Sequence, residues 1–307
     1  MKISGLIGIV VAFGVVSSAT ASFELVLAAG TANGSSEIRR YDGNTGAYLG
    51  SFGQGHFSLA DQMAIDSTKG LVYVADQNRQ TISTFKYSTG EFVNEFNLNA
   101  APTCIVLNSQ GNLVVGLFGV ARIFNPSGDF LGQVTTGSSD TYVLAMDSLG
   151  QLHSFNTTGE YRRYNSSLSL VTSGTVTAAS SYYGNGYVKD GLLHASRYGS
   201  DRMDRFNVSG SGISLNTSFA AGQTDSPLGL AQGHGNRYFQ MGIDPLNVSN
   251  AVIVRGTTNV ASVSKLVTIS GFAPRGLATV VAPEPGTMLA LGAGILALAR
   301  RRTKKKQ

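Results

Sequence analysis

The sequence predicts an all-β body, a six-bladed β-propeller, between two terminal segments that direct sorting. Three observations lead to this fold class. An aromatic motif recurs about every 40 residues, short β-branched and aromatic runs separate its copies, and no 3.6-residue periodicity is sustained between Phe23 and Ala282. The body is therefore predicted to contain almost no helix.

The composition allows a large core and limits the chemistry. Of the 307 residues, 42% are apolar and 13% are charged, and the chain contains 38 glycines and one cysteine. This apolar content is too high for a disordered protein. A single cysteine excludes a disulfide scaffold and any multi-cysteine metal site.

Positive charge is concentrated at the two ends. Lys2 and six C-terminal residues supply seven of the 23 Lys and Arg residues, and the six are Arg300, Arg301, Arg302, Lys304, Lys305 and Lys306. Without these seven and Glu284, the body carries 16 positive and 17 negative charges. A nearly neutral body lacks the basic surface that nucleic-acid binding requires, so we expect no nucleic-acid partner.

Residues 1–21 have the pattern of a secretory signal peptide. Lys2 precedes an apolar stretch at 3–16, and the small residues Ala19 and Ala21 fit a signal-peptidase site, so we expect cleavage after Ala21. A membrane anchor is the alternative, but about 14 apolar residues are short for a span of about 20. The segment predicts export across the inner membrane.

The body, residues 22–281, contains a repeated unit in which an aromatic residue precedes a short polar turn. The leading aromatics lie 44, 39, 40 and 42 residues apart, at Tyr41, Phe85, Phe124, Tyr164 and Phe206. A period of about 40–45 residues is typical of four-stranded propeller blades. About 260 residues at this period predict six blades.

Strand-like runs fill each repeat. Blade-opening strands are predicted at 61–66, 102–108, 141–147, 182–189, 227–232 and 274–280. Second strands follow at 71–76, 112–117, 151–156, 192–197 and 236–242. Outer strands are predicted at 47–52, 92–96, 130–134 and 213–219, and the outer half of blade six at 251–255 and 263–269.

The two ends of the body are predicted to share one blade. Phe23–Ala28 reads as a second strand, and Pro274–Thr279 repeats the pattern of the opening strand at Pro227–Ala231. We therefore expect residues 274–279 to pair with 23–28. This pairing would close the ring and remove exposed strand edges.

The segment from Met63 to Phe85 resembles an NHL-type repeat. It reads Met63-Ala64-Ile65-Asp66, then Gly70-Leu71-Val72-Tyr73-Val74-Ala75-Asp76, then Asn78-Arg79, Ile82 and Phe85. The resemblance is specific over this blade and implies a propeller related to the NHL and gluconolactonase-like groups. It implies no activity by itself, because function depends on sites added to a fold.

The C-terminal segment, 282–307, has three parts. Pro283-Glu284-Pro285 comes first, an apolar helix is predicted at 287–299, and the basic tail occupies 300–307. The twelve apolar residues 288–299 reach about 18 Å at 1.5 Å each, and the long stems of Arg300, Arg301 and Arg302 can extend this short membrane span. The positive-inside rule keeps the tail cytoplasmic as a stop-transfer cluster. A buried core helix is the alternative.

This order of parts resembles the PEP-CTERM sorting signal of Gram-negative bacteria. The resemblance implies recognition by an exosortase, transient anchoring in the inner membrane, processing near the motif, and delivery to the cell surface or an exopolysaccharide matrix. The prolines hold the segment extended and so accessible to a protease. Pro283, Glu284 and Pro285 would thus be a substrate site.

Candidate catalytic and metal-binding residues have structural interpretations. Asp66, Asn108 and Asp147 each precede a turn glycine, which is typical of Asx turns, and metal or acid–base roles remain the alternative. His153 and His194 occupy positions where other repeats carry Tyr73 and Tyr238, so packing is expected. The remaining candidates are His56 and His234 in glycine-rich loops, and Cys104 in an opening strand, where a buried structural thiol is expected.

Two functions from different classes follow. The first is an exported, exosortase-sorted β-propeller at the cell surface or in the extracellular matrix, which binds exopolysaccharide or surface proteins without catalysis and needs no cofactor. The second is a metal-dependent hydrolase, lactonase or lyase of the gluconolactonase-like type. The second predicts two or more acidic or Asn side chains that converge on the central axis.

Overall fold

The structure is a computed structural model that describes residues 24–176, 186–198, 202–209, 212–219, 224–258 and 260–281. All of these residues belong to one compact unit, Phe23–Ala282. They form strands and turns and contain no helix, so the all-β prediction is confirmed for this part of the chain. The predicted signal peptide, sorting motif, apolar helix and basic tail lie outside the described residues.

The first sheet combines strands from the two ends of the body. Its strand order is β23-β1-β2-β3. The strands are β1 (Glu24–Ala32), β2 (Ser35–Asp42), β3 (Tyr48–Phe52) and β23 (Phe272–Val281). Leu27 lies opposite Ala278 in the antiparallel pair of β1 and β23, so the predicted pairing of 23–28 with 274–279 is present.

Three further sheets each contain four strands that follow one another along the chain. The second sheet contains β4 (Ala60–Asp66), β5 (Leu71–Asp76), β6 (Thr81–Lys86) and β7 (Phe92–Asn97). Another contains β15 (Tyr187–Lys189), β16 (Leu192–Arg197), β17 (Arg202–Ser209) and β18 (Gly212–Phe219). The last contains β19 (Asp225–Gln232), β20 (Arg237–Asp244), β21 (Asn247–Thr257) and β22 (Val260–Ile269).

The fifth sheet has seven strands because one long strand belongs to two neighbouring groups. Its strands are β8 (Cys104–Leu107), β9 (Leu113–Gly116), β10 (Phe118–Phe124), β11 (Phe130–Met146), β12 (Leu152–Asn156), β13 (Glu160–Tyr164) and β14 (Leu170–Thr175). The first part of β11 pairs with β10 and the second part with β12. The sequence predicted separate strands at 130–134 and 141–147, but Asp140 in the connection still pairs with Phe118, so the backbone remains extended.

The repeated aromatic motif forms the turn between the third and fourth strands of a group. Four of the five motif aromatics lie opposite the first residues of the outer strand, in the pairs Tyr41–Tyr48, Phe85–Phe92, Phe124–Phe130 and Tyr164–Leu170. Two residues before the outer-strand partner, the backbone is left-handed, with φ of 75°, 80°, 95° and 62° at Gly46, Gly90, Gly128 and Leu168. Glycine adopts this conformation without steric cost, which explains the glycine in most copies.

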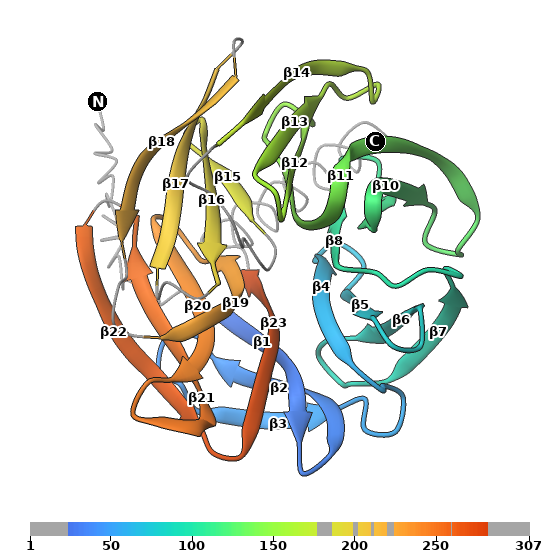
Figure 1. Cartoon of the computed structure of the whole chain (residues 1–307). Coiled ribbons are helices and arrows are strands. Elements are labelled where there is room, and N and C mark those ends of the chain that lie inside the picture. Colours follow the sequence, from blue (N-terminus) through green and yellow to red (C-terminus); the bar gives the residue numbers. More distant parts are fainter. Residues whose placement is uncertain are drawn as a thin grey trace, which may run out of the picture. The chain divides into compact units, whose positions relative to one another are not determined.

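The sheets lie around a central space, with one strand of each group nearest the centre (Figure 1). These inner strands contact one another in the order β23, β4, β8, β11, β15 and β19, and β19 in turn contacts β23. The hydrophobic core is divided among the seams between neighbouring sheets. For example, Leu27 and Phe52 of the first sheet pack with Val74 and Phe85 of the second.

Candidate functional site

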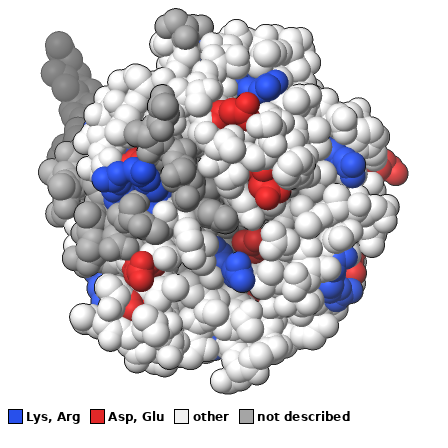
Figure 2. Space-filling view, viewed as in Figure 1, with Lys and Arg blue, Asp and Glu red and all other residues white. Residues whose placement is uncertain are grey.

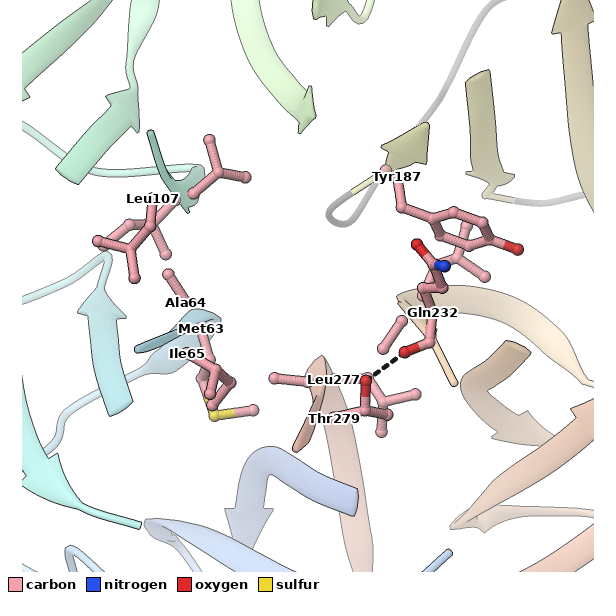
Figure 3. Close-up of a pocket in the computed structure, with 14 residues that line it drawn as sticks. Met63, Ala64, Ile65, Leu107, Tyr187, Gln232, Leu277 and Thr279 are labelled. Atoms are coloured by element: carbon pink, nitrogen blue, oxygen red, sulfur yellow. Dashed lines mark hydrogen bonds between the residues drawn. The ribbon is translucent and has the colours of Figure 1, made fainter. Parts of the chain in front are cut away.

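The inner strands line a central cavity of about 240 Å³. Its wall comes from β4, β8, β19 and β23, together with the start of β15 (Figure 3). Most of the described wall is apolar and includes Met63, Ile65, Leu107 and Leu277. The wall is apolar because the inner strands that form it carry mainly small and aliphatic residues at these positions.

The described wall of this cavity offers few polar groups. Tyr187, Gln232 and Thr279 are the labelled side chains with polar atoms in Figure 3, and the Thr279 hydroxyl donates to the backbone carbonyl of Gln232. The wall residues include no Asp, Glu, His or Asn within the described ranges. Likewise, no group of three His, Cys, Asp or Glu side chains that could hold a metal occurs among the described residues. The side-chain convergence that the metal-dependent alternative predicts is therefore not found in the described wall.

One buried carboxylate, which the sequence did not indicate, lies where β4 begins. Asp61 is 6% exposed, and burial raises the pKa of its carboxyl to about 6, although the nearby positive charge of Arg275 opposes this shift. The neighbouring Gln62 amide donates to the backbone carbonyl of Leu228 at 3.0 Å. Asp61 thus lies at a junction of strands from three sheets, β4, β19 and β23.

The predicted Asx turns are confirmed. Lys69 N donates to Asp66 Oδ1 at 3.0 Å, Asn112 N donates to Asn108 Oδ1 at 2.9 Å, and Gln151 N donates to Asp147 Oδ1 at 2.8 Å. Each side chain satisfies backbone donors that the turn would otherwise leave unpaired. These contacts explain the three residues structurally.

Asp147 also contacts a buried histidine. His153 Nε2 lies 3.3 Å from Asp147 Oδ2, and His153 Nδ1 lies 2.9 Å from the hydroxyl of Tyr161. Burial lowers the pKa of His153, which the Asp147 hydrogen bond opposes. The ring is 2% exposed, so this contact is part of the packing of its sheet, as predicted for a histidine at an aromatic position.

The second buried histidine is also packed against an aromatic ring. His194 stacks on Tyr187 with ring centroids 4.5 Å apart and planes inclined by 11°. Burial lowers the pKa of His194 to about 3, and the positive charge of Arg205 adds to this effect. The imidazole is therefore neutral at physiological pH and serves as a flat packing group.

The loop histidines and the cysteine have structural contacts. His56 stacks on Phe92 at 4.5 Å, and His234 N donates to the buried carboxylate of Glu24 at 2.5 Å. Cys104 is free and buried, and burial raises the pKa of its thiol. A buried thiol with a raised pKa is a poor nucleophile, in agreement with the structural role predicted for it.

Charge is sparse on one face of the described body. On the face that Figure 2 shows, Lys, Arg, Asp and Glu occur singly or in small groups, separated by neutral side chains. This distribution agrees with the nearly neutral body that the sequence predicted. Among the described residues, there is no helix long and apolar enough to cross a membrane.

Comparison with known proteins identifies the C-terminal segment. A profile described as the PEP-CTERM protein-sorting motif matches residues 281–303. The motif indicates an exported protein of Gram-negative bacteria that an exosortase processes and that is transiently anchored in the membrane. It includes Pro283, Glu284, Pro285, Arg300, Arg301 and Arg302, all outside the described residues. No curated protein sequence matches the chain.

Solved structures similar to the chain support a β-propeller-like fold. One is described as a nidogen/laminin complex, with TM-score 0.63 and 12% identity over 83% of this chain and 98% of that chain. Another is a protein of unknown function from Bacteroides caccae, with TM-score 0.60 and 10% identity over 84% and 99% of the two chains. A third contains the WD40 repeats of RRP9, with TM-score 0.51 and 11% identity over 67% and 64%. The relation to NHL-type repeats remains a prediction.

Proposed function

We propose that this chain is an exported binding or structural protein of the cell surface or extracellular matrix, associated with exopolysaccharide and without catalytic activity. The observation that carries the proposal is the sorting-motif match at residues 281–303. Signal peptidase removes residues 1–21 after Ala21. The exosortase then processes the chain near the motif and releases the body from the inner membrane.

The residues of the tail have distinct roles in this sorting step. Pro283 and Pro285 keep the segment extended for the exosortase, and Glu284 offers the enzyme a single negative charge. The apolar helix at 287–299 holds the segment at the membrane. Arg300, Arg301 and Arg302 keep the tail on the cytoplasmic side.

The body forms six blades in a closed ring under this proposal. The cyclic order of contacts among the inner strands supports the ring, and the two halves of β11 supply the outer strand of one blade and the inner strand of the next. Glu24 supports the attachment of β1, because its buried carboxylate pairs with Arg237 at 3.0 Å. Closure leaves few free strand edges, which suits a protein that acts outside the cell.

Binding rather than catalysis is favoured by the character of the central cavity. Its described wall is mainly aliphatic, and the buried histidines are occupied by packing contacts with Tyr161 and Tyr187. Side chains of this kind do not supply a general base with access to a substrate. Partners would thus be bound on other surfaces of the propeller.

Fractionation followed by cosedimentation tests the proposal. We expect the protein in the extracellular polysaccharide fraction of the producing culture, and we expect purified protein to sediment with that polysaccharide after cells are removed. A matched sample with the polysaccharide digested should leave the protein in the supernatant. A protein that remains soluble with intact polysaccharide would contradict the binding role.

A further inference from the structure

Two surface pockets of the same construction lie at seams between sheets. One has a volume of about 400 Å³ and lies between the end of β22 and the turn of the first sheet. The other has a volume of about 420 Å³ and lies between the end of β7 and the turn that joins β10 to β11. Both are therefore built where an outer strand ends beside the aromatic turn of the next group. We call them the seam pockets.

The two pockets correspond residue by residue. An arginine, a buried aromatic, a turn glycine and an exposed aromatic recur in the same order. They are Arg39, Tyr41, Gly46 and Tyr48 in the first pocket and Arg122, Phe124, Gly128 and Phe130 in the second. The arginines differ in their partners, because Arg39 pairs with Glu37 at 2.6 Å whereas Arg122 donates to the Leu98 carbonyl. Because the same residue types recur in two repeats, the pocket belongs to the repeating unit and is not specific to one loop.

The aromatic geometry is also the same. The Tyr41 and Tyr48 rings have centroids 5.6 Å apart, and those of Phe124 and Phe130 are 5.8 Å apart. In each pair the inner ring is buried, whereas the outer ring, Tyr48 or Phe130, is 56% exposed. The buried ring supports the exposed ring, so a rigid aromatic surface faces solvent.

Both pockets share a close approach of the turn backbone to the preceding outer strand. A Cβ placed on Gly46 would lie 2.6 Å from the Leu266 carbonyl oxygen, and one placed on Gly128 would lie 2.6 Å from Phe96 Cγ. The glycines let the turn rest directly against the preceding outer strand, and no side chain from the turn position enters the space. The β6–β7 turn has the same close approach, since a Cβ on Gly90 would lie 2.5 Å from Phe52 Cβ, so the open space depends also on which side chains lie beside the ring.

Hydrogen-bonding groups surround each exposed ring. The second pocket contains Asn97, Asn99 and Gln133 together with Arg122, whose guanidinium donates to the Leu98 carbonyl at 3.2 Å. The first contains Thr268 and Ser270 with Arg39. Amide, hydroxyl and guanidinium groups are the donors and acceptors that match sugar hydroxyls.

Two other seams show the same turn with the space filled. At the β6–β7 turn, the His56 ring stacks on Phe92 at 4.5 Å. At the β13–β14 turn, Leu168 replaces the glycine and packs into the core, while the Tyr164 hydroxyl donates to the Thr135 carbonyl. The two groups of seams share the same turn, but a side chain occupies the space beside the turn only in the second group.

We propose that the two seam pockets are equivalent binding sites for sugar residues of an exopolysaccharide. This inference rests on the proposed function and assigns its site. The C–H face of a pyranose ring packs on the exposed aromatic ring, and the neighbouring amide, hydroxyl and arginine groups bind the sugar hydroxyls. A concave site with an apolar surface and few polar groups suits such a ligand.

Two equivalent sites also explain how a weak contact can retain the protein on a polymer. A repeating polysaccharide offers many copies of the same sugar unit. Once one pocket is occupied, the second binds at a high effective concentration, so the apparent affinity exceeds that of either pocket alone. We therefore expect tighter binding to the polymer than to a short oligosaccharide of the same sugars.

Affinity electrophoresis of the full chain in mild detergent tests the assignment. The native gels contain either exopolysaccharide from the producing culture, alginate or dextran, and the variants are Tyr48→Ala, Phe130→Ala and the double substitution. We expect retardation of the wild type by at least one polymer. Each single substitution should weaken it about tenfold, and the double substitution should weaken it about 100-fold.

The matched control is Leu170→Ala. Leu170 has the same strand position and is 52% exposed, but it lies beside a filled seam, so its replacement should leave retardation unchanged. Unchanged retardation of the double variant, or an equal loss in the control, would overturn the pocket assignment while the proposed function stands. No retardation of the wild type by any of the polymers would overturn both. Equal thermal unfolding midpoints would show that all variants are folded.

Discussion

Asp61 makes the stability of the body depend on pH. Its carboxyl has a pKa of about 6 in the folded protein because it is buried, whereas the pKa of an unfolded Asp is about 4. The folded state therefore keeps this proton over a range in which the unfolded state has lost it. Stability from this group is fully present below about pH 4 and is lost as the pH rises through 6.

Replacement of Asp61 by Asn should remove this dependence. Two pKa units correspond to roughly 2–3 kcal/mol, so we expect Asp61→Asn to increase the free energy of unfolding by about that amount at pH 7 and to have little effect at pH 4. Urea unfolding at the two pH values measures the difference. The control is Asp190→Asn, an exposed position where we expect a change below about 0.5 kcal/mol. Equal effects of Asp61→Asn at both pH values would contradict the account.

Single residues were predictable where their contacts are local. The turn roles of Asp66, Asn108 and Asp147 depend on backbone groups within four residues, and the sequence displays such spacing directly. Asp61 was missed because its surroundings come from distant parts of the chain: the charge of Arg275 lies near its carboxyl, and the adjacent Gln62 donates to the Leu228 carbonyl. The seam pockets were missed for a similar reason, since each combines a turn with the preceding sheet.

At the scale of elements, the seam between β23 and β4 depends on a glycine. A Cβ placed on Gly276 would lie 2.0 Å from the backbone carbonyl oxygen of Asp61. Real Cβ atoms do not approach so closely, and the obstacle is backbone, so one of the two strands would have to move. The close approach of these inner strands thus requires glycine at position 276.

We expect Gly276→Ala to destabilise the body by about 2–3 kcal/mol, because overpacking displaces strands that hold the seam. Thermal or urea unfolding measures the effect. Gly174→Ala is the matched control within a strand, since its nearest neighbour outside the adjoining residues would lie 3.6 Å from the added Cβ. An equal loss of unfolding free energy for Gly276→Ala and Gly174→Ala would contradict the close contact of β23 with β4.

Strand positions were largely predictable because alternating apolar residues and turn signals are local. Predicted strands at 71–76 and 192–197 coincide with β5 and β16. The continuous strand β11 was not predictable, because Gly137 and two serines in its middle resemble a loop. Pairing of Asp140 with Phe118 keeps this segment extended, and such pairing depends on the neighbouring strand.

At the scale of the whole molecule, the last strand of the body adjoins the sorting segment. β23 ends at Val281, and the sorting motif begins at the same residue. Processing on the C-terminal side of this point would leave the pairing of β23 with β1 intact. Release from the membrane would then not disturb the fold.

Two truncations test this division. A chain that ends at Ala282 should retain the unfolding midpoint of the longer chain, because all of β23 is present. A chain that ends at Gly271 lacks β23 and would expose the core residues that Leu277, Ala278 and Val280 now cover, such as Val26 and Leu27, so we expect it to be unfolded or aggregated. Circular dichroism and urea unfolding distinguish these outcomes. A stable fold without β23 would contradict its role in joining the ends.

A propeller-like body and the sorting motif were predictable from periodicity and from the ordered C-terminal segment, whereas the seam pockets were not. A repeat of about 40 residues recurs along the body, so it can be found without a structure. The proposed binding pockets lie where the repeats differ, as between the open seam at Phe130 and the filled seam at Phe92. Such differences depend on packing between sheets.

Mass spectrometry of the extracellular protein tests the central claim, that the chain is exported and processed at its C-terminal motif. The account predicts a mature species that begins at Ser22 and lacks the basic tail, and a longer, membrane-bound species for Glu284→Ala. Glu95→Ala, a substitution within the body, should leave processing unchanged. Recovery of the unprocessed chain from the cytosol, or identical processing of Glu284→Ala and the wild type, would contradict it.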